Sequence, residues 1–312
     1  MKRTLRITGC VLFTILATSA GLAQQPRSFV SGAGSDNNPC TLALPCRTFD
    51  KAISATAVGG EVAATDAAQY DPFKITQSIS IEAPAGASVS APAGGDGVTI
   101  SAPTGSNVVL HGLTVNAEGG GRYGIHCNSD VTLHIENCVV NGFGASSGAG
   151  VEFDGIGKLL VKETVARANY FGISLNPSGG STLFASLDGV SLNSNFLGLI
   201  LGGSGLVLGA IRGSSIIGSG NYGIEVYGSS TGSAYLDIES CLIANNAYGL
   251  LTVNPGGQAA MSISNSLISH NTFMGWNEVG KVGIWSRGNN SVVGNGASSP
   301  TTLTVPVPNF QQ

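Results

Sequence analysis

One short phrase recurs along this chain at nearly constant spacing. The segments RANYFGISL (167–175), NSNFLGLIL (193–201) and ANNAYGLLTV (244–253) share an asparagine, a bulky residue, a glycine and alternating apolar residues. The aligned glycines lie 22–26 residues apart, at Gly124, Gly150, Gly172, Gly198, Gly223, Gly249 and Gly275. A second, apolar set recurs every 25–26 residues, at Leu113, Val139, Val165, Val190, Ile216, Leu242, Leu267 and Val292. Two sets with one period predict a solenoid, a propeller or another array.

The content of each unit selects among these architectures. Stretches such as VTLHIENCVV and YLDIESCLI alternate apolar and polar residues, as half-buried strands do. No unit has the length and 3.6-residue periodicity of a helix, a propeller blade needs about 40 residues, and a leucine-rich repeat needs a leucine framework. We therefore expect short strands joined by bends and stacked as a parallel β-helix. Right-handed crossovers are strongly favoured, so we expect a right-handed coil.

The recurring Asn and Gly residues fit this architecture. Asn169, Asn195 and Asn246 precede the repeated glycine by three residues and Asn221 by two. Stacked amides can hydrogen-bond along the coil axis. For the glycines we expect positive φ angles where each bend enters the next strand.

The ends of the chain differ from the repeats. Residues 1–23 combine a basic start with an apolar run, which is typical of a secretory signal. Removing its three positive charges would change the net charge from −4 to −7, which disfavours nucleic acid as a partner. Residues 24–77 should form an N-terminal cap with one helix near 48–56, residues 78–296 the repeats, and residues 297–312 a tail. Thr48 can cap this helix, and Phe49, Ala52 and Ile53 would form its apolar side. After signal cleavage we expect an exported protein, secreted or periplasmic, without membrane insertion.

Five cysteines follow the signal segment. Cys40 and Cys46 are close enough in sequence to close one disulfide loop, and export would permit it. The other three, Cys127, Cys138 and Cys241, are expected to be small buried side chains. No Cys/His spacing supports a metal site, and no cofactor is indicated.

The segment FVSGAGSDNNPCTLALPCRTFDKAISATAVGGEV, followed by ITQSISI and the repeated coils, resembles the secreted right-handed β-helix proteins of the pectin-lyase-like superfamily. The resemblance covers nearly all of the mature chain. It implies the fold and leaves activity open, because that superfamily includes lyases, polygalacturonases, epimerases and adhesin-like proteins. The polygalacturonase motifs N-T-D, D-D, G-H-G and R-I-K do not occur in this sequence.

Two groups of residues are candidates for function. His126 and Glu152 occupy equivalent outward positions after the repeated glycine, with Asp154 just beyond, so these three are the candidate catalytic residues. Tyr123, Phe171, Tyr222 and Tyr248 each precede a repeated glycine, and stacked aromatic rings can bind sugar faces. For both groups the structural alternative is ordinary surface or packing at a turn.

Two functions follow from these patterns. The first is a non-catalytic β-helix that binds a polysaccharide or cell-surface glycan, or serves as an adhesin-like structural element. The second is a divergent polysaccharide lyase, hydrolase or epimerase acting through His126, Glu152 and Asp154. Near-constant coil lengths favour the first, because an enzyme groove usually needs long flanking loops.

Overall fold

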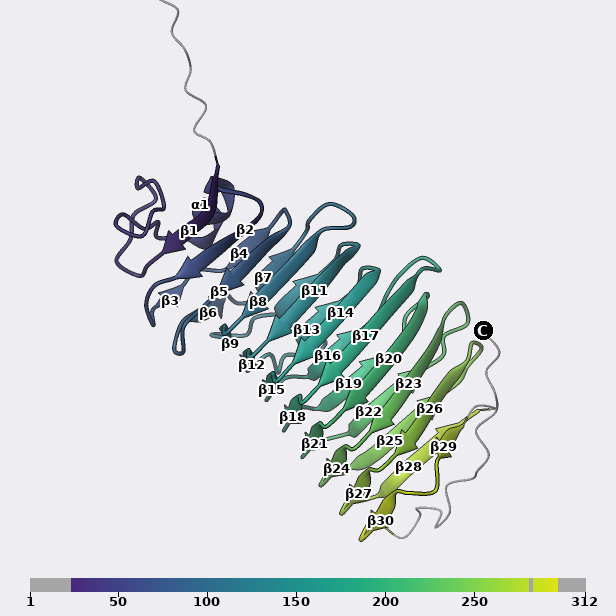
Figure 1. The fold of residues 1–312 in the computed structure, drawn as a ribbon. Helices are drawn as coiled ribbons and strands as arrows, with labels where there is room; N and C mark the ends of the chain where they lie inside the picture. Colours follow the sequence, from purple (N-terminus) through teal and green to yellow (C-terminus); the bar gives the residue numbers. More distant parts are fainter. Residues whose placement is uncertain (1–23, 281–282, 297–312) are drawn as a thin grey trace, which may run out of the picture.

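The computed structural model describes residues 24–280 and 283–296, which form a three-sided solenoid (Figure 1). Each full coil supplies one strand to each of three parallel sheets, and strands of a sheet pair with the coils before and after. This arrangement confirms the predicted all-β parallel solenoid. The predicted signal segment, residues 1–23, and tail, residues 297–312, lie outside the described residues.

The strands fall into three sheets, which we number in the order in which a coil visits them. Sheet 1 contains β1 (Gln25–Val30), β2 (Thr56–Ala64), β5 (Ile79–Glu82), β8 (Asn107–His111), β11 (Val131–Glu136), β14 (Gly157–Lys162), β17 (Thr182–Asp188), β20 (Leu206–Arg212), β23 (Ser233–Glu239), β26 (Ala259–Ser264) and β29 (Ile284–Ser286). Sheet 2 contains β3 (Gln69–Tyr70), β6 (Ser88–Ala91), β9 (Thr114–Ala117), β12 (Val139–Asn141), β15 (Val165–Arg167), β18 (Ser191–Asn193), β21 (Ser215–Ile217), β24 (Leu242–Ala244), β27 (Leu267–Ser269) and β30 (Ser291–Val293). Sheet 3 contains β4 (Phe73–Ile75), β7 (Asp96–Ile100), β10 (Tyr123–Cys127), β13 (Ala149–Phe153), β16 (Phe171–Leu175), β19 (Leu197–Leu201), β22 (Tyr222–Tyr227), β25 (Tyr248–Val253) and β28 (Met274–Val279).

The N-terminal end carries the helix that the sequence predicted. Helix α1 (Phe49–Ala55) begins after Thr48, whose side chain accepts a hydrogen bond from the Lys51 amide. Its buried side chains, Phe49, Ala52 and Ile53, are the expected apolar face. The helix packs against β1, β2 and β4. The stacking of coils already begins with β2, ahead of residue 78.

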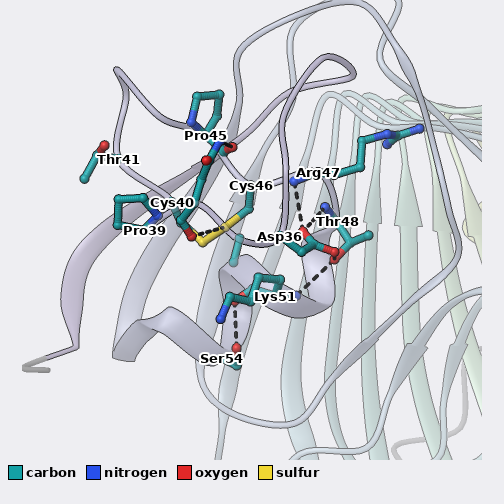
Figure 2. The surroundings of a disulfide bond; sticks show 12 residues. Asp36, Pro39, Cys40, Thr41, Pro45, Cys46, Arg47, Thr48, Lys51 and Ser54 are labelled. Carbon is teal, nitrogen blue, oxygen red and sulfur yellow. Dashed lines mark hydrogen bonds between the residues drawn. A yellow bond between two sulfur atoms is a disulfide. The ribbon is translucent and has the colours of Figure 1, made fainter. Parts of the chain in front are cut away.

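A short loop next to this helix is closed by the predicted disulfide between Cys40 and Cys46 (Figure 2). The Asp36 carboxylate joins the loop to the helix start, because it accepts hydrogen bonds from the Arg47 amide and from the amide and hydroxyl of Thr48. Cys127, Cys138 and Cys241 are free and buried, as expected. Burial raises the pKa of the Cys127 thiol to about 12, so it is an unreactive thiol at neutral pH.

The glycine repeat keeps perfect register through sheet 3, but its physical reason is not the one predicted. None of the repeated glycines has a positive φ angle. A Cβ atom on Gly172 would lie 2.4 Å from the carbonyl oxygen of Gly198 in the next coil and 2.8 Å from the Nδ2 atom of Asn195. The column therefore requires glycine because neighbouring backbones approach too closely for any side chain.

The apolar repeat keeps its period but mixes neighbouring registers. Val139 pairs with Val165, which then pairs with Ser191 and not with Val190. The inward position is the next one along, occupied by Val140 and its equivalents. Apolar residues occupy adjacent positions here, so the sequence period alone does not show which of the two is the paired position. The choice matters, because a shift of one residue along a strand moves a side chain from the core to the surface.

The predicted asparagine stack is present in two runs. The Oδ1 atom of Asn195 accepts hydrogen bonds from the amide and the Nδ2 atom of Asn169, at 3.0 and 3.1 Å. Asn246 bonds to Asn271 in the same way. Between the runs Ser219 takes the position, and Asn221, which the spacing had included, lies outside the stack. The stack satisfies buried backbone amides at the bend between sheets 2 and 3.

The outer face of sheet 1 carries a ladder of alternating charges, one residue per coil. The charges that alternate are those of Glu136, Lys162, Asp188, Arg212 and Glu239. Glu82 and His111 extend the same column toward the N-terminal end. Two neighbouring pairs approach closely: His111 Nδ1 lies 2.9 Å from Glu82 and Arg212 lies 2.7 Å from Asp188. Opposite charges on adjacent strands favour this register over its alternatives.

We expect Gly172→Ala to lower the free energy of unfolding by about 1–3 kcal/mol, because its Cβ would press against the next coil. Gly144→Ala is the matched control, since its Cβ would meet only the Ala168 carbonyl oxygen at 3.6 Å. The control should change stability by less than about 0.5 kcal/mol. Urea unfolding followed by circular dichroism measures both, and equal effects would contradict the close-approach explanation.

Candidate functional site

The predicted stacking of His126 on Glu152 is confirmed. His126 in β10 pairs with Glu152 in β13, which pairs with Ser174 in β16. The complete outward column of sheet 3 contains Lys74, Thr99, His126, Glu152, Ser174, Ile200, Glu225, Leu251 and Asn277. Residues far apart in the sequence thus form one line on the molecule.

His126 is held between two carboxylates. Its Nδ1 atom lies 2.8 Å from Oδ2 of Asp96, and its Nε2 atom lies 3.1 Å from Oδ2 of Asp154. Burial lowers the pKa of His126, but the hydrogen bonds and charges of Asp154 and Asp96 outweigh it and raise the pKa to about 9. The imidazole is therefore charged at neutral pH, with both ring N–H groups donating.

Glu152 is an outward residue that is nevertheless buried, with 5% of its surface exposed. Burial raises its pKa, and the hydrogen bond and negative charge of Asp154 raise it further, to about 8. The Asp154 pKa moves in the opposite direction: burial would raise it, but hydrogen bonds from His126 and Glu152 hold it below its usual value. The Glu152–Asp154 pair therefore holds one proton at neutral pH, and that proton lies on Glu152.

A further feature supports a protonated Glu152. The Oδ1 atom of Asp154 is buried and has no other hydrogen-bond donor. The protonated Glu152 carboxyl is a donor to Asp154, so it supplies what a buried carboxylate oxygen needs. At neutral pH the cluster of Asp96, His126, Asp154 and neutral Glu152 carries one negative charge, and the nearby cation of Arg122 lies over the Tyr123 ring at 4.6 Å.

Glu152 opens into a cavity of about 370 Å³ on the outside of sheet 3, which we call the Glu152 cavity. Hydroxyl and amide groups line it, together with the rings of Tyr123 and Phe171 and the apolar side chain of Ile200. The polar lining residues are Ser147, Ser174, Asn176, Tyr227 and Ser229. Glu152 is the one ionisable acid or base of the lining apart from the tyrosines. Such a surface suits an uncharged ligand with both hydroxyls and apolar faces.

The four predicted aromatic residues share one register, but they do not form a single stripe. Ala149 separates Tyr123 from Phe171, and Leu197 follows Phe171. Tyr123 and Phe171 line the Glu152 cavity. Tyr222 and Tyr248 lie outside the cavity and contact each other, with ring centroids 4.8 Å apart and ring planes tilted by 31°. The sequence therefore grouped residues that the structure divides between two places.

Asp96 was missed by the sequence reasoning. It lies in β7 and pairs with Tyr123, and its carboxylate reaches His126 in the next coil. The segment GDGVTI (95–100) contains Gly97, which is 27 residues before Gly124. Extending the glycine repeat upstream by one coil would have identified this residue.

A second hollow was also missed, on the outer face of sheet 1. This groove has a volume of about 720 Å³ and crosses β17, β20, β23, β26 and β29. Phe184, Leu208 and Tyr235 pair in successive coils along it, and Trp285 lies farther along, in β29. No lysine, arginine or histidine lines the groove, and its one carboxylate, Asp237, hydrogen-bonds to Ser262. The signal in the sequence was apolar residues at outward strand positions.

Within the described residues, no group of three or more His, Cys, Asp or Glu side chains is suited to holding a metal ion. Over the same residues, no helix has both the length and the apolar character needed to span a bilayer.

Comparison with known proteins identifies the architecture. No protein-family model matches the chain, and no curated protein matches its sequence. Among solved structures, pectate lyase Pel9A superposes with a TM-score of 0.59 at 13% identity, covering 91% of this chain and 80% of that one. The Dettilon tailspike protein gp208 gives 0.56 at 15% identity, covering 86% of this chain and 59% of that one. The alginate lyase from Paenibacillus sp. str. FPU-7 gives 0.52 at 11% identity, with 86% and 96% covered.

The chain has the pectin-lyase-like right-handed β-helix fold. The resemblance seen in the sequence is thereby confirmed at the level of fold. At these identities the likeness extends to the path of the backbone and carries no assignment of activity.

We expect His126 to make stability depend on pH. Its pKa is about 9 in the folded protein and about 6.5 when unfolded, so its contribution is complete below pH 6.5 and is lost as the pH rises through 9. The contribution should be roughly 1–3 kcal/mol. Because ionisation of Glu152 also costs stability over part of this range, the comparison is made between Glu152→Gln and the double variant Glu152→Gln/His126→Gln. The difference in free energy of unfolding between these two variants, measured with urea, should be larger at pH 6 than at pH 9.5. An equal difference at both pH values would contradict a charged His126 held by Asp96 and Asp154.

Proposed function

We propose that this protein is an exported, non-catalytic glycan-binding β-helix whose glycan chain lies in the groove of sheet 1. The observation that carries the proposal is the row of Phe184, Leu208 and Tyr235 in successive coils. Trp285 lines the same groove farther along, in the neighbouring column, where it pairs with Ser262. Aromatic rings bind the C–H faces of sugars, and a row that follows the solenoid axis suits an extended chain.

The polar groups of the groove support the same ligand. Tyr235 hydrogen-bonds through its hydroxyl to Gln258, and Thr182 and Ser262 offer further hydroxyls. Sugar hydroxyls pair with such groups. The lack of cations among the lining residues favours an uncharged glycan over a polyuronate, whose carboxylates would need positive partners.

Export and a glycan partner also agree with other features. The Cys40–Cys46 disulfide forms readily only in an oxidising compartment, which suits a secreted or periplasmic protein. Pectate lyase and alginate lyase, which share the fold, are named for polysaccharide substrates. We extend to this chain only the general class of ligand, a polysaccharide or cell-surface glycan.

The groove can be tested with its own tryptophan. The chain contains two tryptophans, and Trp276 is buried, so Trp276→Phe leaves Trp285 as the reporter. Cellohexaose, xylohexaose or mannohexaose should change its fluorescence saturably, whereas hexagalacturonate should not. Phe184→Ala and Tyr235→Ala should each weaken binding about three- to tenfold, as expected for one lost aromatic contact.

Phe196→Ala is the matched control, because Phe196 is an exposed ring at the bend between sheets 2 and 3, where it stacks on Tyr170. This variant should bind like the parent. An unchanged spectrum with every neutral hexasaccharide, or equal weakening by the control variant, would refute glycan binding in the groove.

A second candidate function is the divergent lyase, hydrolase or epimerase. In its favour, the pKa values of Glu152 and Asp154 are pushed apart, as they are in catalytic acid–base pairs. Against hydrolysis, these carboxyls hydrogen-bond directly, whereas glycosidase carboxyls stand about 5–9.5 Å apart. The geometry therefore supports binding better.

We expect no turnover of pectate, alginate, xylan or glucan, measured by new reducing ends and by the ultraviolet absorbance of unsaturated products. Turnover that Glu152→Gln abolishes would establish the enzymatic alternative. Turnover that survives this substitution would exclude Glu152 as its catalytic acid.

A further inference from the structure

The Glu152 cavity is separate from the groove, because it lies on the outside of sheet 3 and none of its lining residues belongs to sheet 1. It is built from five successive coils: Tyr123 comes from the first, Glu152 from the second, Phe171 and Ser174 from the third, Ile200 from the fourth, and the fifth begins with β22. Tyr227 and Ser229 close its far side. At about 370 Å³ it is near the lower limit for ligand sites, which suits a ligand of one or two rings.

We propose that the Glu152 cavity binds a single uncharged sugar ring, with Glu152 as part of the recognition surface. The choice of a sugar rests on glycan binding as the proposed function. The Glu152 cavity and the groove of sheet 1 share no lining residue, so binding at one can fail while binding at the other holds.

The lining carries the case for an uncharged polyhydroxylated ring. Phe171 and Ile200 offer apolar contact, while the hydroxyls of Ser147 and Ser174 offer hydrogen bonds around them. A uronate would place its carboxylate beside the Glu152–Asp154 pair, where a second negative charge is disfavoured. The nearby cations are already engaged: His126 with its two carboxylates, and Arg122 over the Tyr123 ring.

The charge state of Glu152 is set by all the groups that surround it. Asp154 follows it at the end of β13, and Asp96 lies on β7, behind His126. His126 and Tyr123 face it from β10. On its other side Ser174 in β16 presents a neutral hydroxyl. The acidic neighbour and burial together keep the proton on Glu152 up to a pH of about 8.

A bound neutral ring would remove water from Glu152 and so favour its protonated form further. By linkage, the ligand must then bind the protonated protein more tightly, and affinity must fall as Glu152 ionises. A ligand that stays positively charged through pH 9, such as a guanidinium sugar, would show the opposite behaviour, because its cation would pair with the ionised carboxylate and displace the proton. The direction of the pH dependence therefore distinguishes the two ligand classes.

The test uses methyl glycosides of matched shape and different charge. The neutral probes are the methyl glycosides of glucose, galactose and mannose, and the anionic probes are those of glucuronate and galacturonate. The cationic probes are the 6-deoxy-6-guanidino derivatives of the glucose and galactose glycosides, which stay charged at both pH values. Binding to the full-length mature protein is measured by saturation-transfer NMR and calorimetry at pH 7 and 9. We expect a neutral glycoside to bind, and its affinity to fall about tenfold between these pH values, in proportion to the protonated fraction of Glu152.

Two variants assign the effect. Glu152→Gln keeps the shape and stays uncharged, so it should bind within about threefold of the parent at pH 7 and lose the decline at pH 9. Glu225→Gln is the matched control: Glu225 occupies the same column, is also buried enough for its pKa to be raised, and does not line the cavity. It should keep both the affinity and the decline. Circular dichroism confirms that each variant is folded.

Three results would overturn the proposal. The first is no binding by any neutral methyl glycoside while the hexasaccharides still bind the groove, which would leave the proposed function intact. The second is tighter binding of a guanidino sugar as the pH rises, with loss of binding in Glu152→Gln. The third is a decline at pH 9 that persists in Glu152→Gln. Failure of both the cavity and the groove would instead reject glycan binding as the function.

Discussion

Hydrogen bonding between successive coils is the constraint on which the rest of this structure depends. A strand pairs with equivalent residues about 25 positions earlier and later, not with a strand of its own coil. A single coil cannot satisfy its backbone or close its core, so stability arises only when coils stack. The glycine column follows directly: from Gly124 to Gly249, a Cβ on each repeated glycine would lie within 3 Å of a carbonyl oxygen of the next coil. Glycine therefore repeats in the sequence because the backbones of neighbouring coils lie too close together for a side chain.

The same stacking explains how a buried acid arises on an outer face. A side chain in a column has neighbours directly above and below, so Glu152 lies between His126 and Ser174. Its position within the strand points it outward, yet its neighbours and the cavity walls remove most of its contact with water. Burial then raises its pKa and the adjacent Asp154 raises it further. Ile200, two coils along the same column, meets no such set of acids.

The sequence predicted the architecture well because one period was repeated many times. It also predicted the register of His126 on Glu152, the cap of helix α1 and the Cys40–Cys46 disulfide, each of which depends on local spacing. It could not settle the register of the apolar set, because adjacent apolar residues such as Val139 and Val140 fit the period equally well. It also missed Asp96 and the groove of Phe184 and Tyr235, since these depend on which side chains meet across coils. The roles of His126, Glu152 and Asp154 stay predictions, because register shows proximity and not chemistry.

The alternating charges on sheet 1 favour adding or removing coils in pairs. Each coil places one charge in the line from Glu136 to Glu239, and the sign changes at every step. Removing one internal coil would bring two like charges face to face, whereas removing an adjacent pair would restore the alternation. A protein of this kind can therefore lengthen or shorten most easily by two coils at a time. Its growth by duplication would then carry a unit of about 50 residues, twice the period of the backbone.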